Sequence, residues 1–138
     1  MGKRITAYGC ARALAIVVTF GAVHGAYAHH SFAMFDNENQ IKLKGTVTDF
    51  QWGNPHVYIE MDVAGENGAH NAWTIECANP GILNRIGWKF NMIKTGDELM
   101  VIVAPLRTGQ PGALLKEVTL PDGRVFGNGG PAGPALIH

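Results

Sequence analysis

The stretch PHVYIEMDVAGENGAHNAWTIEC, residues 55–77, decides the fold that we predict for this chain of 138 residues. Apolar and polar side chains alternate strictly in its first part, PHVYIEMDV, which is the period of a β-strand with one buried face. The last part, HNAWTIEC, alternates in the same way, and GENG between the two is typical of a tight turn. The stretch therefore predicts a β-hairpin, whose buried faces coincide when Met61 lies opposite Trp73.

Further strands are predicted on either side of the hairpin. Their ranges are Gln40–Trp52, Glu98–Ala104 and Ala113–Leu120, with a short extended piece at Arg124–Phe126. The range Glu98–Ala104 is apolar on both faces, which is typical of a strand that is covered from both sides.

The hydrophobic period changes between the hairpin and the next strand. GILNRIGW, residues 81–88, carries apolar side chains at helical spacing, which predicts a helix of one or two turns. Asn79 is a suitable N-cap, Pro80 suits the first turn, and Gly87 can end the helix.

The predicted order is three strands, one short helix and two strands, which is the order of an OB-fold. We therefore expect a mainly-β protein, a small OB-like five-stranded barrel with its helix between strands three and four. A β-sandwich is the alternative, although sandwiches usually contain more strands than this chain offers. The barrel domain would occupy residues 40–126, between an N-terminal segment at 29–39 and a flexible Gly/Pro-rich tail at 127–138.

Residues 1–28 have the pattern of a secretory signal peptide. Their start is basic, ALAIVVTFGAV at 13–23 is apolar, and AYA at 26–28 fits a cleavage site after Ala28. The apolar run is shorter than the ~20 residues that a membrane-spanning helix needs, so a transmembrane anchor is the weaker alternative. We expect export to the periplasm and no membrane span in the mature chain.

Cleavage changes the charge of the chain. Three of the 11 basic residues and none of the 11 acidic ones lie in residues 1–28, so the mature net charge is 8 minus 11, or −3. An acidic domain lacks the positive surface that phosphate backbones require, which argues against nucleic acid as a partner. Cys77 is the one cysteine that remains, and a single cysteine cannot form an internal disulfide.

The loop QWGNPH, residues 51–56, is the predicted ligand-binding site. OB-folds bind ligands through the loop that joins their first two strands, which here offers Trp52, Asn54 and His56, followed by Tyr58. Trp52 would supply a flat apolar surface, and His56 a nitrogen whose charge changes near neutral pH. The expected ligand is a small molecule or a partner protein from the periplasm. The alternative is that Asn54 and Pro55 only shape the turn and that His56 caps a backbone carbonyl.

Two histidines would begin the mature chain and suggest an alternative function. Cleavage after Ala28 would leave His29 with a free α-amine and an imidazole, which can chelate one metal ion together. His56 could complete this histidine brace as its third ligand, and nitrogen ligands of this kind suit copper. His30 offers a second route, since a histidine at position two can bind Cu(II) through the amine, a backbone nitrogen and its imidazole. The alternative function is therefore a copper-binding protein with a metal site at His29, His30 and His56. A solvated tail without a metal is the other interpretation of the two histidines.

The sequence contains no complete catalytic constellation, which favours a binding module over an enzyme. Glu60 and Asp62 share an outward strand face that is typical of a solvated surface. Cys77 points inward without an obvious base partner, as a small core residue would. Arg85 on the short helix is expected to pair with Glu76.

Six short segments carry a resemblance to a known family. AHHSFAMFD, LKGTVTDFQWGNPH, WTIE, LNRIGW, KTGDEL and PDGR, in this order, resemble small exported bacterial proteins catalogued as domain of unknown function 6152. The resemblance spans residues 28–126 and differs mildly after His56, where Val57-Tyr58 stands in place of a frequent tryptophan or another bulky residue. It implies export and a compact β-domain without implying an activity, and it groups His29 and His30 with His56.

Overall fold

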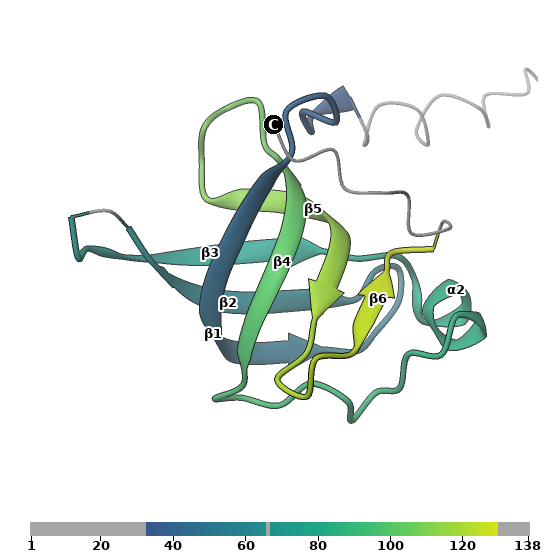
Figure 1. The fold of residues 1–138 in the computed structure, drawn as a ribbon. Helices are drawn as coiled ribbons and strands as arrows, with labels where there is room; N and C mark the ends of the chain where they lie inside the picture. The colour runs from purple at the N-terminus through teal and green to yellow at the C-terminus, as the bar shows by residue number, and fades with distance from the viewer. Residues whose placement is uncertain (1–32, 66, 130–138) are drawn as a thin grey trace, which may run out of the picture.

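The structure is a computed structural model that describes residues 33–65 and 67–129. Figure 1 shows one body of β-strands with a short helix at its side. Its elements in chain order are β1 (Ile41–Gln51), β2 (Tyr58–Ala64), β3 (His70–Glu76), α2 (Pro80–Arg85), β4 (Glu98–Pro105), β5 (Gly112–Thr119) and β6 (Val125–Gly127). Among the described residues, none forms a helix that is both long and apolar enough to cross a membrane.

Five of the strands close into a barrel. The strand order is β3-β2-β1-β4-β5-β6, and an additional parallel pairing of β3 with β5 joins the two sides of the sheet. In Figure 1, β1 and β4 cross the front of the barrel while β2 and β3 cross behind them. The short helix lies between β3 and β4 in the chain, so the predicted OB-like barrel is confirmed. The sixth strand, β6, adds to the edge of β5.

The hairpin of β2 and β3 has the predicted register. Met61 lies opposite Trp73, and Ile59 lies opposite Ile75. The turn ends at Gly68, whose φ of 71° is the left-handed conformation that a tight turn favours and that glycine adopts easily. Alternation places every second side chain of β2 in the core, which orients the side chains between them outward.

The core contains side chains from every barrel strand and from the helix. Trp88 is fully buried after α2, and its Nε1 donates a hydrogen bond to the carbonyl oxygen of Gly127 at 3.0 Å. The largest buried side chains are Trp88, Ile59, Met61, Ile75, Leu83, Leu99 and Leu115. The indole therefore joins the helical segment to β6 through an apolar contact and a hydrogen bond.

The helix begins and ends as its sequence predicts. The side chain of Asn79 accepts a hydrogen bond from the backbone nitrogen of Ile82 at 2.9 Å, and Pro80 occupies the first turn. The chain leaves the helix at Gly87, whose φ is 97°. Leu83 is the buried residue of this short helix.

One strand differs from its prediction. We expected Glu98–Ala104 to be covered on both faces, but Met100 in β4 is 40% exposed. The outer face of β4 is covered only near its end, where Phe35 packs on Ala104 and Leu114. This covering segment arrives from the N-terminal side of β1, far away in the sequence, so the hydrophobic pattern of β4 alone could not show it.

The segment before β1 is fixed to the end of β4. The backbone nitrogen of Asp36 donates to the carbonyl oxygen of Pro105 at 2.8 Å, and that of Arg107 donates to the carbonyl oxygen of Met34 at 2.9 Å. A hydrogen bond from Asn39 and the nearby charge of Arg107 lower the pKa of Asp36. The described N-terminal segment is therefore part of the folded domain.

Candidate binding face

The loop between β1 and β2 is held against the end of β3. The backbone nitrogen of Val57 donates to the carbonyl oxygen of Ala78 at 3.2 Å, and that of Cys77 donates to the carbonyl oxygen of Val57 at 2.8 Å. The side chain of Val57 is fully buried. Because neighbouring residues of an extended chain point to opposite sides, this anchoring directs His56 and Tyr58 outward. The peptide bond between Asn54 and Pro55 in this loop is cis.

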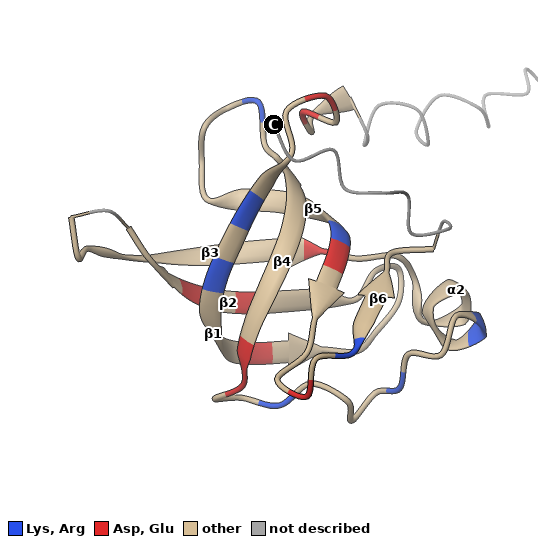
Figure 2. Ribbon diagram, viewed as in Figure 1, with Lys and Arg blue, Asp and Glu red and all other residues tan. Residues whose placement is uncertain are grey.

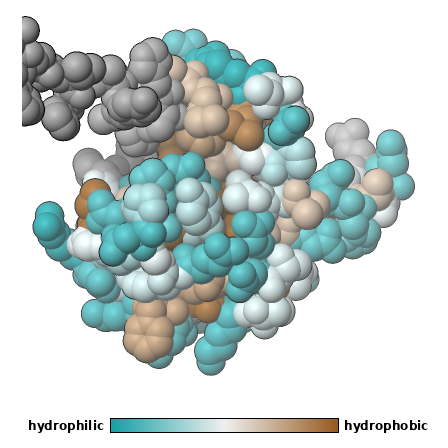
Figure 3. All heavy atoms as spheres, turned by 180° about the vertical axis from the view of Figure 1, so that it is seen from behind, coloured by the Kyte–Doolittle hydropathy of each residue, from teal (hydrophilic) through white to brown (hydrophobic). Residues whose placement is uncertain are grey.

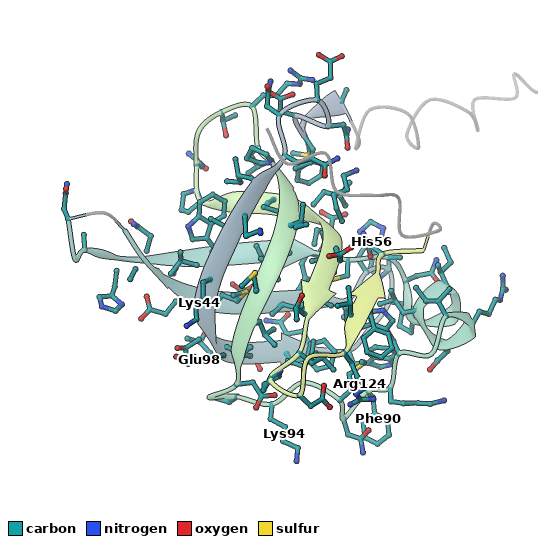
Figure 4. The ribbon with its side chains drawn as sticks, viewed as in Figure 1. Lys44, His56, Phe90, Lys94, Glu98 and Arg124 are labelled. Atoms are coloured by element: carbon teal, nitrogen blue, oxygen red, sulfur yellow. The ribbon has the colours of Figure 1, made fainter. Side chains whose placement is uncertain are left out.

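The imidazole of His56 lies against the carboxylate of Glu76, the last residue of β3. Its Nδ1 lies 2.5 Å from Oε1 of Glu76, and the two side chains are 34% and 21% exposed. Figure 4 labels His56 at the side of the barrel, beyond the ends of the strands. A carboxylate at Nδ1 favours a proton on that nitrogen, which leaves Nε2 as the hydrogen-bond acceptor of a neutral ring. Among the described residues, Nε2 of His56 has no hydrogen-bond partner.

Tyr58 lies beside this pair. Its ring centroid is 6.4 Å from that of His56, and Tyr58 is directly opposite Glu76 in the register of β2 and β3. Burial and the negative charge of Glu76 raise the pKa of the Tyr58 hydroxyl. The hydroxyl therefore remains protonated at neutral pH and can donate a hydrogen bond to a ligand.

Further polar contacts join the outward side chains of β2 and β3 beyond Tyr58 and Glu76. Thr74 donates from Oγ1 to Oε2 of Glu60 at 2.8 Å, and Nδ1 of His70 lies 2.7 Å from Oδ2 of Asp62. We call this surface the β2–β3 face. It consists of His56, Tyr58, Glu60, Asp62, His70, Thr74 and Glu76. Neither strand contains lysine or arginine, and Figure 2 shows only red acidic segments on them. The β2–β3 face therefore has a negative charge.

A shallow hollow of about 240 Å³ lies at the far end of the β2–β3 face. Asp62 and His70 line it from the face, and Lys44 and Glu98 line it from β1 and β4. Nζ of Lys44 is 3.4 Å from Oε2 of Glu98, and both of these side chains are about two-thirds exposed. Solvent screens such a pair, so the hollow is less able to hold a ligand by charge than the half-buried pair at His56.

The structure brings some of the predicted ligand-binding residues together. His56 and Tyr58 lie side by side, whereas Trp52 from the same loop packs partly buried against the core, with its ring 5.8 Å from that of Phe50. Asn54 is exposed in the loop. The flat surface expected of Trp52 is thus partly used for packing.

Glu76 is the residue that sequence reasoning missed. We expected it to pair with Arg85, but its partner in the structure is His56. The alternation of β3 already directs Glu76 outward, and the hairpin register places it opposite Tyr58. His56 comes two residues before Tyr58, so the hairpin register also places Glu76 close to His56. The distance between the two residues along the chain gives no indication of this contact.

The predicted copper site is only partly within the described residues. His29 and His30 lie outside them, so the distance from either residue to His56 is not given by the structure. Within residues 33–65 and 67–129, no group of three or more His, Cys, Asp or Glu side chains could hold a metal ion. Any metal site at His56 would therefore need a ligand from the rest of the chain or from outside it.

Cys77 lies behind the face and not on it. Its side chain is 1% exposed. Burial raises the pKa of the thiol, and the charge of Glu76 raises it further. A protonated, inaccessible thiol is a poor nucleophile, so Cys77 acts as the core residue that its inward position predicts.

Comparison with known proteins gives one family and two solved structures of low similarity. A family model described as "Family of unknown function (DUF6152)" matches residues 17–115. No curated protein matches the chain. Among solved structures, the mitochondrial single-stranded DNA binding protein Rim1 from S. cerevisiae matches with 14% identity and a TM-score of 0.46, over 60% of this chain and 93% of that one. A selenomethionine-labelled crystal of the same protein matches with 16% identity and a TM-score of 0.39, over 66% and 97% of the two chains.

Proposed function

Because the chain belongs to the DUF6152 family, whose function is unknown, we propose a function from the geometry of its barrel. The protein is an exported, periplasmic binding module. Its β2–β3 face binds a positively charged ligand, either a small molecule or a basic segment of a periplasmic protein. The contact between His56 and Glu76 is the centre of this site.

The observation that carries the proposal is the half-buried pair of His56 and Glu76. The carboxylate fixes the imidazole, so that Nε2 is presented as an oriented acceptor, and the protonated hydroxyl of Tyr58 supplies a donor beside it. Side chains that are already fixed lose little conformational entropy when a ligand binds. An acceptor, a donor and a carboxylate at one point suit a ligand with N–H groups.

The negative charge of the β2–β3 face favours a ligand with a positive charge. Glu60, Asp62 and Glu76 are negative, and the same strands provide no lysine or arginine to balance them. In OB-folds the surface of strands two and three and the loop between strands one and two are the usual binding region. Here that region would repel phosphate groups and attract cations, which argues against a nucleic-acid ligand.

An NMR titration tests the proposal. Backbone amide signals of the protein are followed while a cationic probe, spermidine, is added at low salt, and a lysine-rich peptide is used in a parallel series. We expect shifts centred on His56, Tyr58 and Thr74 that disappear in high salt. Stronger binding of the peptide would indicate a protein ligand, and stronger binding of spermidine a small molecule.

Two variants test whether binding in the titration depends on Glu76 or on any exposed carboxylate. Glu76→Gln should weaken binding about fivefold, since a single charge contact at a partly exposed site is worth about 1 kcal/mol. Glu38→Gln is the matched control, because Glu38 is an exposed carboxylate in the segment before β1. The proposal is wrong if the two variants bind equally, or if a polyanion shifts the same amide signals as strongly.

Export is tested separately from binding. Mass spectrometry of the protein recovered from the periplasmic fraction should give a chain that begins at His29. A chain that retains residues 1–28, or that stays in the cytoplasm, would contradict the export proposal and leave the binding proposal unaffected.

Copper binding is the second hypothesis for this region. Histidines that bind metals commonly donate their other ring N–H to a carboxylate, and the orientation of His56 against Glu76 is compatible with this pattern. The test is an extension of one residue ahead of His29, which would abolish chelation by the terminal amine. If Cu(II) affinity of the exported protein is unchanged by the extension, the brace hypothesis is wrong.

A further inference from the structure

A second surface of the molecule differs from the β2–β3 face in charge and in polarity. The segment from α2 to the start of β4, residues 80–96, contains three basic residues and no acidic one. It also contributes three of the large hydrophobic side chains that are exposed in the described chain, namely Ile82, Ile86 and Phe90. We call the set Ile82, Arg85, Ile86, Lys89, Phe90 and Lys94 the basic–apolar patch.

Phe90 is the most exposed of these hydrophobic side chains. It is 69% exposed, although it follows the fully buried Trp88 by only two residues. Figure 4 shows Phe90 and Lys94 at the lower rim of the barrel. Viewed from behind in Figure 3, hydrophobic side chains are exposed at the same lower rim among hydrophilic ones. An aromatic ring therefore projects from a segment whose own charged residues are all basic.

We propose that the basic–apolar patch binds the surface of an anionic membrane, with Phe90 inserted among the lipid headgroups. The charge of residues 80–96 complements such a surface. Lysine side chains can place their charge at the headgroups while their carbon stems lie along the apolar region, and an aromatic ring is stable at the same depth. A peripheral contact of this kind needs no membrane-spanning helix.

The composition of the patch favours lipid over an acidic protein. The centres of protein–protein interfaces are depleted of lysine, whereas two of the three basic residues here are lysines. A membrane surface also accepts a projecting ring without a pocket of matching shape. The acidic β2–β3 face shares no residue with the patch, so a membrane-bound molecule could still present it to a ligand.

Cosedimentation with lipid vesicles tests the proposal. The protein is expressed from its full sequence, purified in the form that the cell produces, and mixed with vesicles of phosphatidylcholine alone or with an equal share of phosphatidylglycerol. We expect binding only to the anionic vesicles, with loss of binding as salt is raised. Since each basic residue at an anionic surface contributes about fivefold in affinity, the double variant Lys89→Ala, Lys94→Ala should bind about 25-fold more weakly.

Matched variants distinguish membrane binding by the basic–apolar patch from nonspecific adsorption to lipid. Phe90→Ser should weaken binding about tenfold through the lost ring contact, whereas Met34→Ser, at a side chain that is 49% exposed elsewhere, should have no effect. Lys42→Ala, on the outer surface of β1, is the control for charge. Equal binding to uncharged vesicles, no binding to either kind, or equal loss in the patch and control variants would overturn the proposal.

Discussion

Nδ1 of His56 and Oε1 of Glu76 lie 2.5 Å apart and join the loop before β2 to the last residue of β3. These residues are 20 positions apart in the chain. The contact exists because the hairpin register places Tyr58 opposite Glu76, which brings the residue two positions before Tyr58 within reach of the carboxylate. The arrangement of the proposed site is thus a consequence of strand pairing.

The first prediction concerns the tautomer of His56. At a pH where the imidazole is neutral, we expect its proton on Nδ1, because the carboxylate of Glu76 lies beside that nitrogen. In Glu76→Ala this carboxylate is absent, and the proton should redistribute toward Nε2. Long-range nitrogen–proton NMR spectra of the ring distinguish the two tautomers. Glu60→Ala is the control, since Glu60 contacts Thr74 instead, and a tautomer that is unchanged by Glu76→Ala would contradict the orienting role.

The second prediction concerns the close approach of β1 and β2. A Cβ atom added at Gly45 would lie 2.6 Å from the carbonyl oxygen of Asp62 and 2.9 Å from Cγ2 of Val63. Because the first of these atoms belongs to the backbone, the two strands would have to separate. Gly45→Ala should lower the free energy of unfolding by about 1–3 kcal/mol.

Gly53 provides the control for this measurement. A Cβ atom at Gly53 meets nothing within 4 Å, and its φ is not in the left-handed region. Gly53→Ala should therefore change the free energy of unfolding by only about 0.5 kcal/mol. Urea unfolding of both variants checks the pair, and equal effects would mean that the strands tolerate the methyl group at Gly45.

Local patterns in the sequence were enough to predict the hairpin and the helix. The alternation of side chains determines which face of β2 is buried, and a slip of one residue in the pairing would expose that face. The register that keeps both buried faces together places Met61 opposite Trp73. The capping of α2 by Asn79 depends on residues within one turn of each other. Such features are local, which is why the chain order of strands and helix sufficed to identify the barrel.

Contacts between distant segments could not be predicted in the same way. The covering of Ala104 by Phe35 depends on the path of the segment before β1, and nothing in the pattern of β4 encodes that path. For the same reason the exposure of Met100 was missed. In the candidate site, the outward direction of His56 followed from alternation, but the choice of Glu76 as its partner, in place of Arg85, required the three-dimensional structure.

The third prediction concerns the helix. Leu83 is fully buried, whereas its neighbour Ile82 is 37% exposed. Leu83→Ala should lower the free energy of unfolding by about 3 kcal/mol, because it leaves a cavity among the core side chains. Ile82→Ala should cost less than about 1 kcal/mol, since part of the side chain is already in water and alanine favours a helix. Thermal or urea unfolding measures both, and similar losses would mean that the helix does not anchor the core through Leu83.

The last prediction concerns Cys77 and alkaline pH. Burial, together with the charge of Glu76, raises the pKa of its thiol in the folded protein above the ordinary value of 9.0. Above pH 9 the unfolded chain therefore releases a proton that the folded protein retains, and stability falls as the pH rises, by at most about 1.4 kcal/mol per pH unit from this thiol. Below that range the thiol is protonated in both states and has no such effect.

Urea unfolding of the wild type and of Cys77→Ala from pH 7 to about pH 10 isolates the contribution of this thiol. The variant should be less stable at neutral pH, because a small cavity replaces the sulfur atom, and it should lose less stability as the pH rises. Tyr58 and the other titrating groups are present in both proteins, so they cancel in the difference. The native thiol should also resist iodoacetamide that modifies it rapidly in urea. If the two proteins lose stability at the same rate with pH, the thiol ionises as easily inside the barrel as outside it.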